Sequence, residues 1–131
     1  MEEGILVGDR GVSNRHGLSL SNGRIIPFTG AEGARTGIKC VDTAPNQGPA
    51  ISMSNVGFFG EHERSFWIGA ESSAKITVLG GQATEYTNEM VLCQSPDASV
   101  RLVSVRSFRG NGPRVNNPGQ GDIEDVSPMT S

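Results

Sequence analysis

The stretch ASVRLVSVR at residues 98–106 decides the fold class of this chain. Its side chains alternate with a period of two, so that Val100 and Leu102 face one way and Arg101, Val103 and Val105 the other. Because aliphatic residues occur on both faces, we expect a strand that is central in its sheet or covered on both sides.

Shorter runs of the same kind recur along the chain and are separated by glycine, proline and asparagine, which is the signature of β-strands. The stretch 84–90 is compatible with a short helix, but its β-favouring residues favour a loop that leads into a strand. We therefore expect strands at residues 37–42, 50–56, 65–68, 75–79 and 89–93.

The segment 17–28 predicts a β-hairpin. Leu18 and Leu20 alternate with serines, and Asn22-Gly23 is the residue pair typical of a type I′ turn. Pro27 lacks an N–H group, so the second strand is expected to be an edge strand or to end there.

Composition limits the classes of protein that this chain can belong to. Its 131 residues include 18 glycines, seven prolines and 35% hydrophobic residues, which suits one small domain and excludes a helical bundle. The net charge of −3 predicts that neither a nucleic acid nor a membrane is a partner. The acidic start Met1-Glu2-Glu3-Gly4 has no secretory signal pattern, so we expect synthesis in a cytoplasm.

The composition changes after Arg109 and divides the chain into three parts. Residues 1–16 form a first strand or an N-terminal arm, and residues 17–109 form the β domain. Residues 110–131 contain few aliphatic side chains and cannot bury enough apolar surface to become ordered alone. This last segment is a disordered tail or an extended C-terminal arm on a neighbouring subunit, and we favour the arm.

No motif in the sequence indicates catalysis, a cofactor or a metal site. His16 and His62 stand apart from any metal-binding pattern, and the turn around His62, residues 61–63, is expected to be solvated. Cys40 and Cys93 lie in strand-like surroundings and are expected to be buried free thiols. We therefore expect a protein that is not an enzyme.

Aromatic and basic residues point instead to contacts with other proteins. Trp67 lies between Phe66 and Ile68, which favours a core or interface position over a platform for sugars. Nine of the eleven basic residues are arginine, a residue type that suits interfaces, although a base-composition bias in the gene explains this equally well.

The segment 65–105 resembles a β-module of bacteriophage fibres, tail proteins and capsid decorations. The resemblance rests on the succession FWI (66–68), AKITV (74–78), a Gly80-Gly81 turn, MVL (90–92) and SVRLVS (99–104). The chain departs from that pattern at Arg101, where a small polar residue is usual, and it has no Asp-Gly followed by Trp after Ser104. The resemblance implies a homotrimer of short strands that binds a virion.

These observations predict an all-β fold, either a small β-sandwich or jelly roll or a trimeric β domain with a C-terminal arm. The expected function is that of a capsid decoration (cement) protein in a virion, a homo-oligomer that bridges copies of the major capsid protein. A tail or head fibre component, or a receptor- or carbohydrate-binding β-module, is the alternative, and a small enzyme comes third. The expected interface residues are Trp67, Arg101, Arg106, Arg109, Arg114, Val115, Ile123 and Val126.

Overall fold

A computed structural model of the chain describes residues 3–7, 17–25, 36–40 and 50–127, and all regular structure in these ranges is β-strand. None of the described residues belongs to a helix that could cross a membrane. The strands are β1 (Glu3–Val7), β2 (Gly17–Ile25), β3 (Thr36–Cys40), β4 (Ala50–Phe58), β5 (His62–Ile68), β6 (Lys75–Leu79), β7 (Gln82–Thr84), β8 (Tyr86–Cys93), β9 (Ser99–Val103), β10 (Arg106–Phe108), β11 (Val115–Asn116) and β12 (Asp122–Val126).

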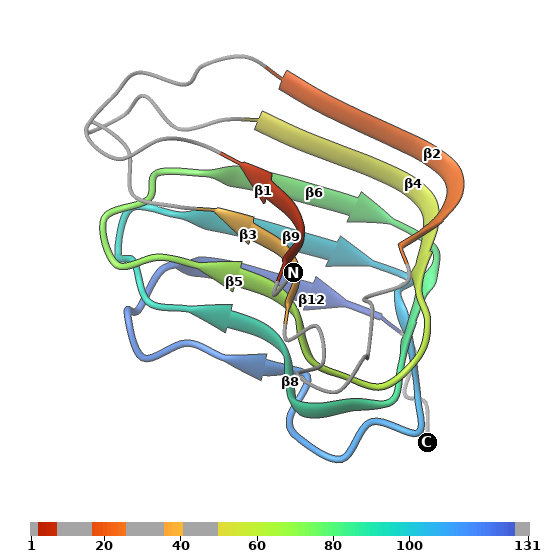
Figure 1. Cartoon of the computed structure of the whole chain (residues 1–131). Coiled ribbons are helices and arrows are strands. Elements are labelled where there is room, and N and C mark those ends of the chain that lie inside the picture. Colours follow the sequence, from red (N-terminus) through yellow and green to blue (C-terminus); the bar gives the residue numbers. More distant parts are fainter. Residues whose placement is uncertain (1–2, 8–16, 26–35, 41–49, 128–131) are drawn as a thin grey trace.

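The strands wind into a β-solenoid, in which every described pair of strands is parallel. One sheet has the order β1-β3-β5-β8-β11, and we call it sheet A. The other, sheet B, has the order β10-β7-β4-β6-β9-β12, with β2 also paired to β4. In the view of Figure 1, β1, β3, β5 and β8 of sheet A and β2, β4, β6, β9 and β12 of sheet B descend in chain order, so each coil of the chain forms one rung on the coil before it.

The all-β class is confirmed, and strands occur where the period-two pattern predicts them, but their arrangement differs from a β-sandwich or jelly roll. Those folds are built from antiparallel strands, whereas these strands return to the same sheet one rung later. The strand expected at residues 98–106 ends at Val103, because the left-handed backbone of Ser104 bends the chain there and turns Val105 into the core. The β-hairpin expected at residues 17–28 is wrong. Residues 17–25 form the single strand β2, which pairs in parallel with β4 from Gly17 to Ile25, and residues 26–28 lie outside the described part.

Aliphatic side chains fill the solenoid in columns that run from rung to rung. Register places Ile51 of β4 on Ile76 of β6 and then on Val100 of β9, all of them buried. In sheet A a second column contains Ile38, Phe66 and Val91, and the Phe66 ring packs edge-on against Phe58 at 5.0 Å between centroids. Burial of these columns is the main stabilisation of the fold.

Sheet B bends sharply where each rung carries a residue with left-handed backbone geometry. These residues are Asn22 (φ 53°), Asn55 (φ 55°), Gly80 (φ 72°) and Ser104 (φ 55°), and strand register stacks them in one column. We call this column the corner. The sequence correctly marks Asn22 as a turn residue, but a single left-handed residue bends a strand, whereas a type I′ turn needs two to reverse it.

The C-terminal segment, expected as an arm on a neighbouring subunit, lies on the sheets of its own chain. β11 pairs with β8, and β12 pairs with β9. Gly112, Gly119 and Gly121 lie directly on the backbone of the preceding rung, where a Cβ atom would collide with main-chain atoms. These glycines contribute little apolar surface to the segment, but they allow its backbone to stack closely on the preceding rung.

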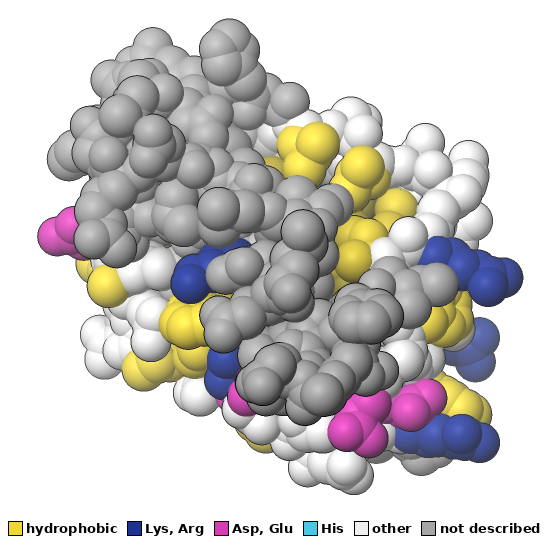
Figure 2. All heavy atoms as spheres, viewed as in Figure 1, with side chains coloured by type: hydrophobic (Ala, Val, Ile, Leu, Met, Phe, Trp, Pro, Cys, Tyr) yellow, Lys and Arg dark blue, Asp and Glu magenta, His cyan; other side chains and the backbone are white. Residues whose placement is uncertain are grey.

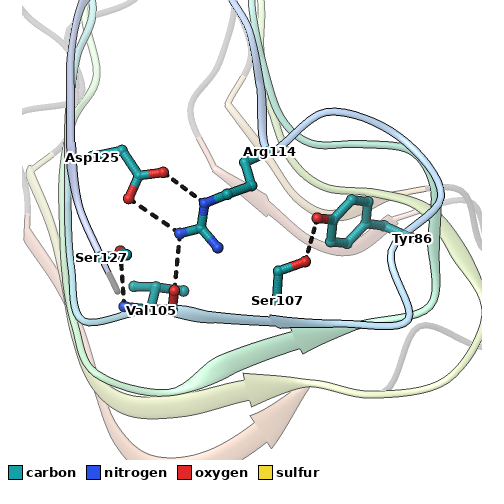
Figure 3. Close-up of polar contacts among 6 residues, drawn as sticks. All are labelled: Tyr86, Val105, Ser107, Arg114, Asp125 and Ser127. Carbon is teal, nitrogen blue, oxygen red and sulfur yellow. Dashed lines mark hydrogen bonds and ion pairs between the residues drawn. The ribbon is translucent and has the colours of Figure 1, made fainter. Parts of the chain in front are cut away.

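Arg114 fixes this last rung to the one before it. Its Nε donates to Asp125 Oδ2 at 2.7 Å, and one terminal nitrogen donates to Val105 O at 2.9 Å (Figure 3). Burial raises the pKa of the Asp125 carboxyl, but hydrogen bonds from Arg114 and Ser127 outweigh it and hold the pKa below its usual range.

The two adjacent glycines at the corner predict different costs for the same substitution. Gly80→Ala should cost about 1 kcal/mol, because only left-handed strain opposes a methyl group that meets open space. Gly81→Ala should cost roughly 2–4 kcal/mol, because its Cβ would also collide with the Val56 backbone. Urea unfolding followed by circular dichroism measures both, and equal costs would contradict the close contact at Gly81.

Candidate ligand-binding groove

A groove of about 410 Å³ lies on the outer surface at the corner of the solenoid. Its walls come from β2, β4, β7 and β10, which the chain brings together from positions more than 80 residues apart. Figure 2 shows Lys and Arg side chains along the right-hand edge of the molecule, the side on which β2 and β4 bend in Figure 1. The groove is lined by Asn22, Gly23, Arg24, Asn55, Gly57, Phe59, Gly81, Gln82 and Arg106.

Two stacked asparagines form one wall of the groove. The left-handed geometry at Asn22 and Asn55 turns both side chains in the same direction, and Asn55 Nδ2 donates to Asn22 Oδ1 at 3.1 Å. Asparagine tolerates this backbone geometry better than other non-glycine residues, which accounts for its use on both rungs. The pair leaves one amide nitrogen and one amide oxygen for other partners.

A second column runs along the groove and is charged at both ends. Strand register stacks Arg24 of β2, Gly57 of β4, Gln82 of β7 and Arg106 of β10. At about 4.8 Å per rung, the two arginine Cα atoms lie about 14 Å apart. Gly57 has no side chain, and the Phe59 ring fills the space that a Cβ atom there would occupy, so this ring lines the groove between the charged ends.

Neither arginine of the groove is neutralised by a described carboxylate. The guanidinium of Arg24 lies 5.4 Å from the centroid of the Phe59 ring, and neither Arg24 nor Arg106 forms an ion pair with a described residue. The described lining of the groove contains no acidic side chain. A site with two free guanidinium groups is suited to binding an anion.

Of the residues expected at an interface, only Arg106 lines this groove. Arg101 forms an exposed ion pair with Glu124 at 3.4 Å, and Arg109 lies over the exposed ring of Phe108. Arg114 makes the contacts within the chain described above. The guanidiniums of these three arginines are thus directed at groups of their own chain.

The expected apolar interface residues fall into two groups. Val115 and Ile123 are partly buried and pack against the core of their own chain. Val126 is 57% exposed on the outer face of sheet B, in one column with Val103 and with Leu79, which is 50% exposed. Sequence reasoning missed Leu79 because the outward face of that strand is apparent only once its register is known.

Trp67 lies half-buried on the outer face of sheet A between two cations. Lys39 Nζ lies 4.2 Å and the Arg64 guanidinium 4.9 Å from the centroid of its ring. Its indole N–H donates to Gln94 Oε1 at 2.9 Å, and Arg64 Nε is 2.5 Å from Glu89 Oε1. These contacts hold the ring in place, and a cation–π pair of this kind contributes about 0.5–1 kcal/mol at an exposed site.

His62 is buried, so the solvated turn expected around it is wrong. It begins β5, and its ring is held by Gly60 O near Nδ1 and Ser65 Oγ near Nε2, both at 2.8 Å. Because a carbonyl can only accept, Nδ1 carries the proton and Nε2 accepts from the Ser65 hydroxyl. Burial lowers the pKa of His62, although the Gly60 hydrogen bond and the charge of Glu85 oppose the shift. His16 lies outside the described residues.

The two cysteines are buried free thiols, as expected. Burial raises the pKa of Cys40 to about 12, and it also raises the pKa of Cys93. Both occupy one column of sheet A, but Ile68 lies between them. Their Cα atoms are therefore two rungs, about 9.6 Å, apart, which is too far for a disulfide.

Comparison with known proteins gives no relative from which a role could be transferred. No protein-family model, no curated protein and no solved structure matches the chain. Within the described residues, no three His, Cys, Asp or Glu side chains cluster in a way that could hold a metal ion.

His62 predicts an acid-sensitive fold. The folded protein resists protonation of this ring, whereas the unfolded chain accepts a proton near pH 6.5, so stability should be full above pH 6.5 and fall as the pH drops below it. In His62→Gln the slope of unfolding free energy against pH should become shallower between pH 6.5 and 5. Urea unfolding at several pH values measures the slope, and an unchanged slope would contradict a buried neutral histidine.

Proposed function

We propose that the chain is a non-enzymatic structural protein of a virion, of the fibre type, which assembles through the open edge of its last rung. The resemblance of residues 65–105 to phage fibre and decoration modules supports the virion assignment. The observation that carries the assembly mode is the free edge of β12.

Among the described residues, the backbone of β12 has hydrogen-bond partners on one side only. Asp122 N–H donates to Ala98 O, and Val126 O accepts from Ser104 N–H, so these alternate residues face β9. The backbone groups of Ile123 and Asp125 then face the opposite edge, where no described strand pairs with β12. A row of such groups is a template for another strand.

The occupant that we propose for this edge is β2 of a second copy. β12 carries the acidic residues Asp122, Glu124 and Asp125, whereas β2 carries Arg24 and no acidic residue. Leu18 and Leu20 of β2 are only partly buried, and a copy placed below β12 would continue the Ile123 column with Leu18. Such a head-to-tail contact does not close on itself, so it produces a filament, which suits a fibre.

A capsid decoration protein that assembles as a homotrimer is the second candidate, and a different surface favours it. Leu79, Val103 and Val126 form an aliphatic column on the outer face of sheet B, with Leu79 and Val126 at least half exposed. Such a lateral column suits contacts between solenoids side by side or with the major capsid protein. Recovery of the chain from purified virus particles by mass spectrometry tests the virion assignment common to both candidates.

The two assembly modes predict opposite responses to two substitutions. In the fibre mode the protein should form a ladder of oligomers with steps of 13.8 kDa. Ile123→Pro should abolish the ladder because it removes an N–H from the free edge, and Ile123→Val should retain it. Leu79→Lys should leave the ladder unchanged. Size-exclusion chromatography with light scattering measures all four proteins, and circular dichroism verifies their folds.

The decoration mode gives the reverse pattern. There the protein is a discrete trimer, which Leu79→Lys dissociates and Ile123→Pro leaves intact. A monomer at every concentration contradicts both modes of assembly.

A further inference from the structure

The groove at the corner has a combination of groups of which assembly through β12 uses only Arg24. Arg24 and Arg106 stand at its two ends, and neither forms an ion pair with a described residue. The whole chain is acidic, with a net charge of −3, so two arginines of one groove that no described carboxylate neutralises form a local exception. Exposed charges interact over about 8 Å at physiological salt, so a bound group is affected mainly by these two.

The space between the arginines offers hydrogen bonds of both kinds. In the Asn22–Asn55 pair, the Asn22 amide N–H₂ group and the Asn55 amide oxygen have no hydrogen-bond partner among the described residues, and Gln82 adds a further amide. A hydroxyl both donates and accepts, so mixed amide groups suit a ligand rich in hydroxyls. A simple anion such as sulfate would use the donors and leave the acceptors without partners.

The shape of the groove favours a short chain of rings. Its volume of about 410 Å³ lies within the range of about 300–1,000 Å³ for sites of small ligands. Its lining residues come from four successive rungs, and its charged ends are about 14 Å apart. Between these ends the Phe59 ring fills the space that a side chain at Gly57 would occupy, and it lines the groove there.

A single-stranded nucleic acid fits this site less well. Such ligands bind to grooves in which successive bases stack on free aromatic faces. The groove contains only one described aromatic ring, Phe59, and the guanidinium of Arg24 already lies over it. The acidic chain as a whole would also repel a long polyanion.

We propose that the corner groove is a binding site for an acidic oligosaccharide. Arg24 and Arg106 each bind a carboxylate of a different sugar unit, and the amides of Asn22, Asn55 and Gln82 bind the hydroxyls between them. This binding requires neither the free edge of β12 nor a second copy, and Arg106 belongs to the groove alone, so Arg106 variants distinguish failure of this proposal from failure of the assembly proposal.

The proposal is tested by calorimetric titration of the full chain with three probes: a galacturonate trisaccharide, the neutral galactose trisaccharide and sodium sulfate. The acidic trisaccharide should bind, and its affinity should fall as salt is raised. Arg24→Gln and Arg106→Gln should each weaken binding at least about tenfold, since each removes a hydrogen-bonded charge. Arg106→Lys should bind more tightly than Arg106→Gln because it keeps the charge.

Arg101→Gln is the matched control. It removes another exposed arginine of the same solenoid, one that pairs with Glu124 outside the groove, so binding should not change. Equal binding of the neutral trisaccharide would overturn the acidic class of ligand. Binding of sulfate alone would overturn the saccharide, and absence of binding to all three probes, or binding unaffected by Arg24→Gln and Arg106→Gln in folded protein, would overturn the site.

Discussion

In-register parallel stacking is the constraint on which the rest of this structure depends. Each residue of a rung lies on its counterpart in the rung before, so residues in one column must have compatible shapes and backbone geometries. Inside, the columns are aliphatic, as at Ile51, Ile76 and Val100. At the corner the same rule demands a left-handed residue on successive rungs, because a rung that turned elsewhere would lose its parallel hydrogen bonds.

Much of the secondary structure could be predicted from the sequence, but the way the strands pair could not. Alternation such as that of residues 98–106 reports that one face of a strand is buried, and burial is similar in a sandwich and a solenoid. Parallel or antiparallel pairing depends on where the chain goes between strands, and Asn22-Gly23 offered a plausible antiparallel turn. The structure shows that the chain bends there and continues along the same rung.

A repeated pentapeptide was the signal that could have revealed the solenoid. The segments LSLSN (18–22), ISMSN (51–55), ITVLG (76–80), VRLVS (100–104) and IEDVS (123–127) occupy equivalent positions of successive rungs. Few letters are shared, because the stacking selects shape and backbone geometry rather than identity, and the intervals of 33, 25, 24 and 23 residues are unequal. Alignment of these rungs is what places Arg24 and Arg106 in the same groove. The groove therefore could not be predicted from the sequence without recognising the repeat.

The column that holds Cys40, Ile68 and Cys93 has a consequence for how such a chain can change its length. Solenoids gain and lose whole rungs, since each rung contacts only its neighbours. Loss of the rung that contributes Ile68 would place the two thiols on adjacent rungs, about 4.8 Å apart, within the range of disulfide geometry. The rung that contributes Ile68 therefore separates a chain with two inert thiols from a shorter chain in which an oxidising environment could form a disulfide between adjacent rungs.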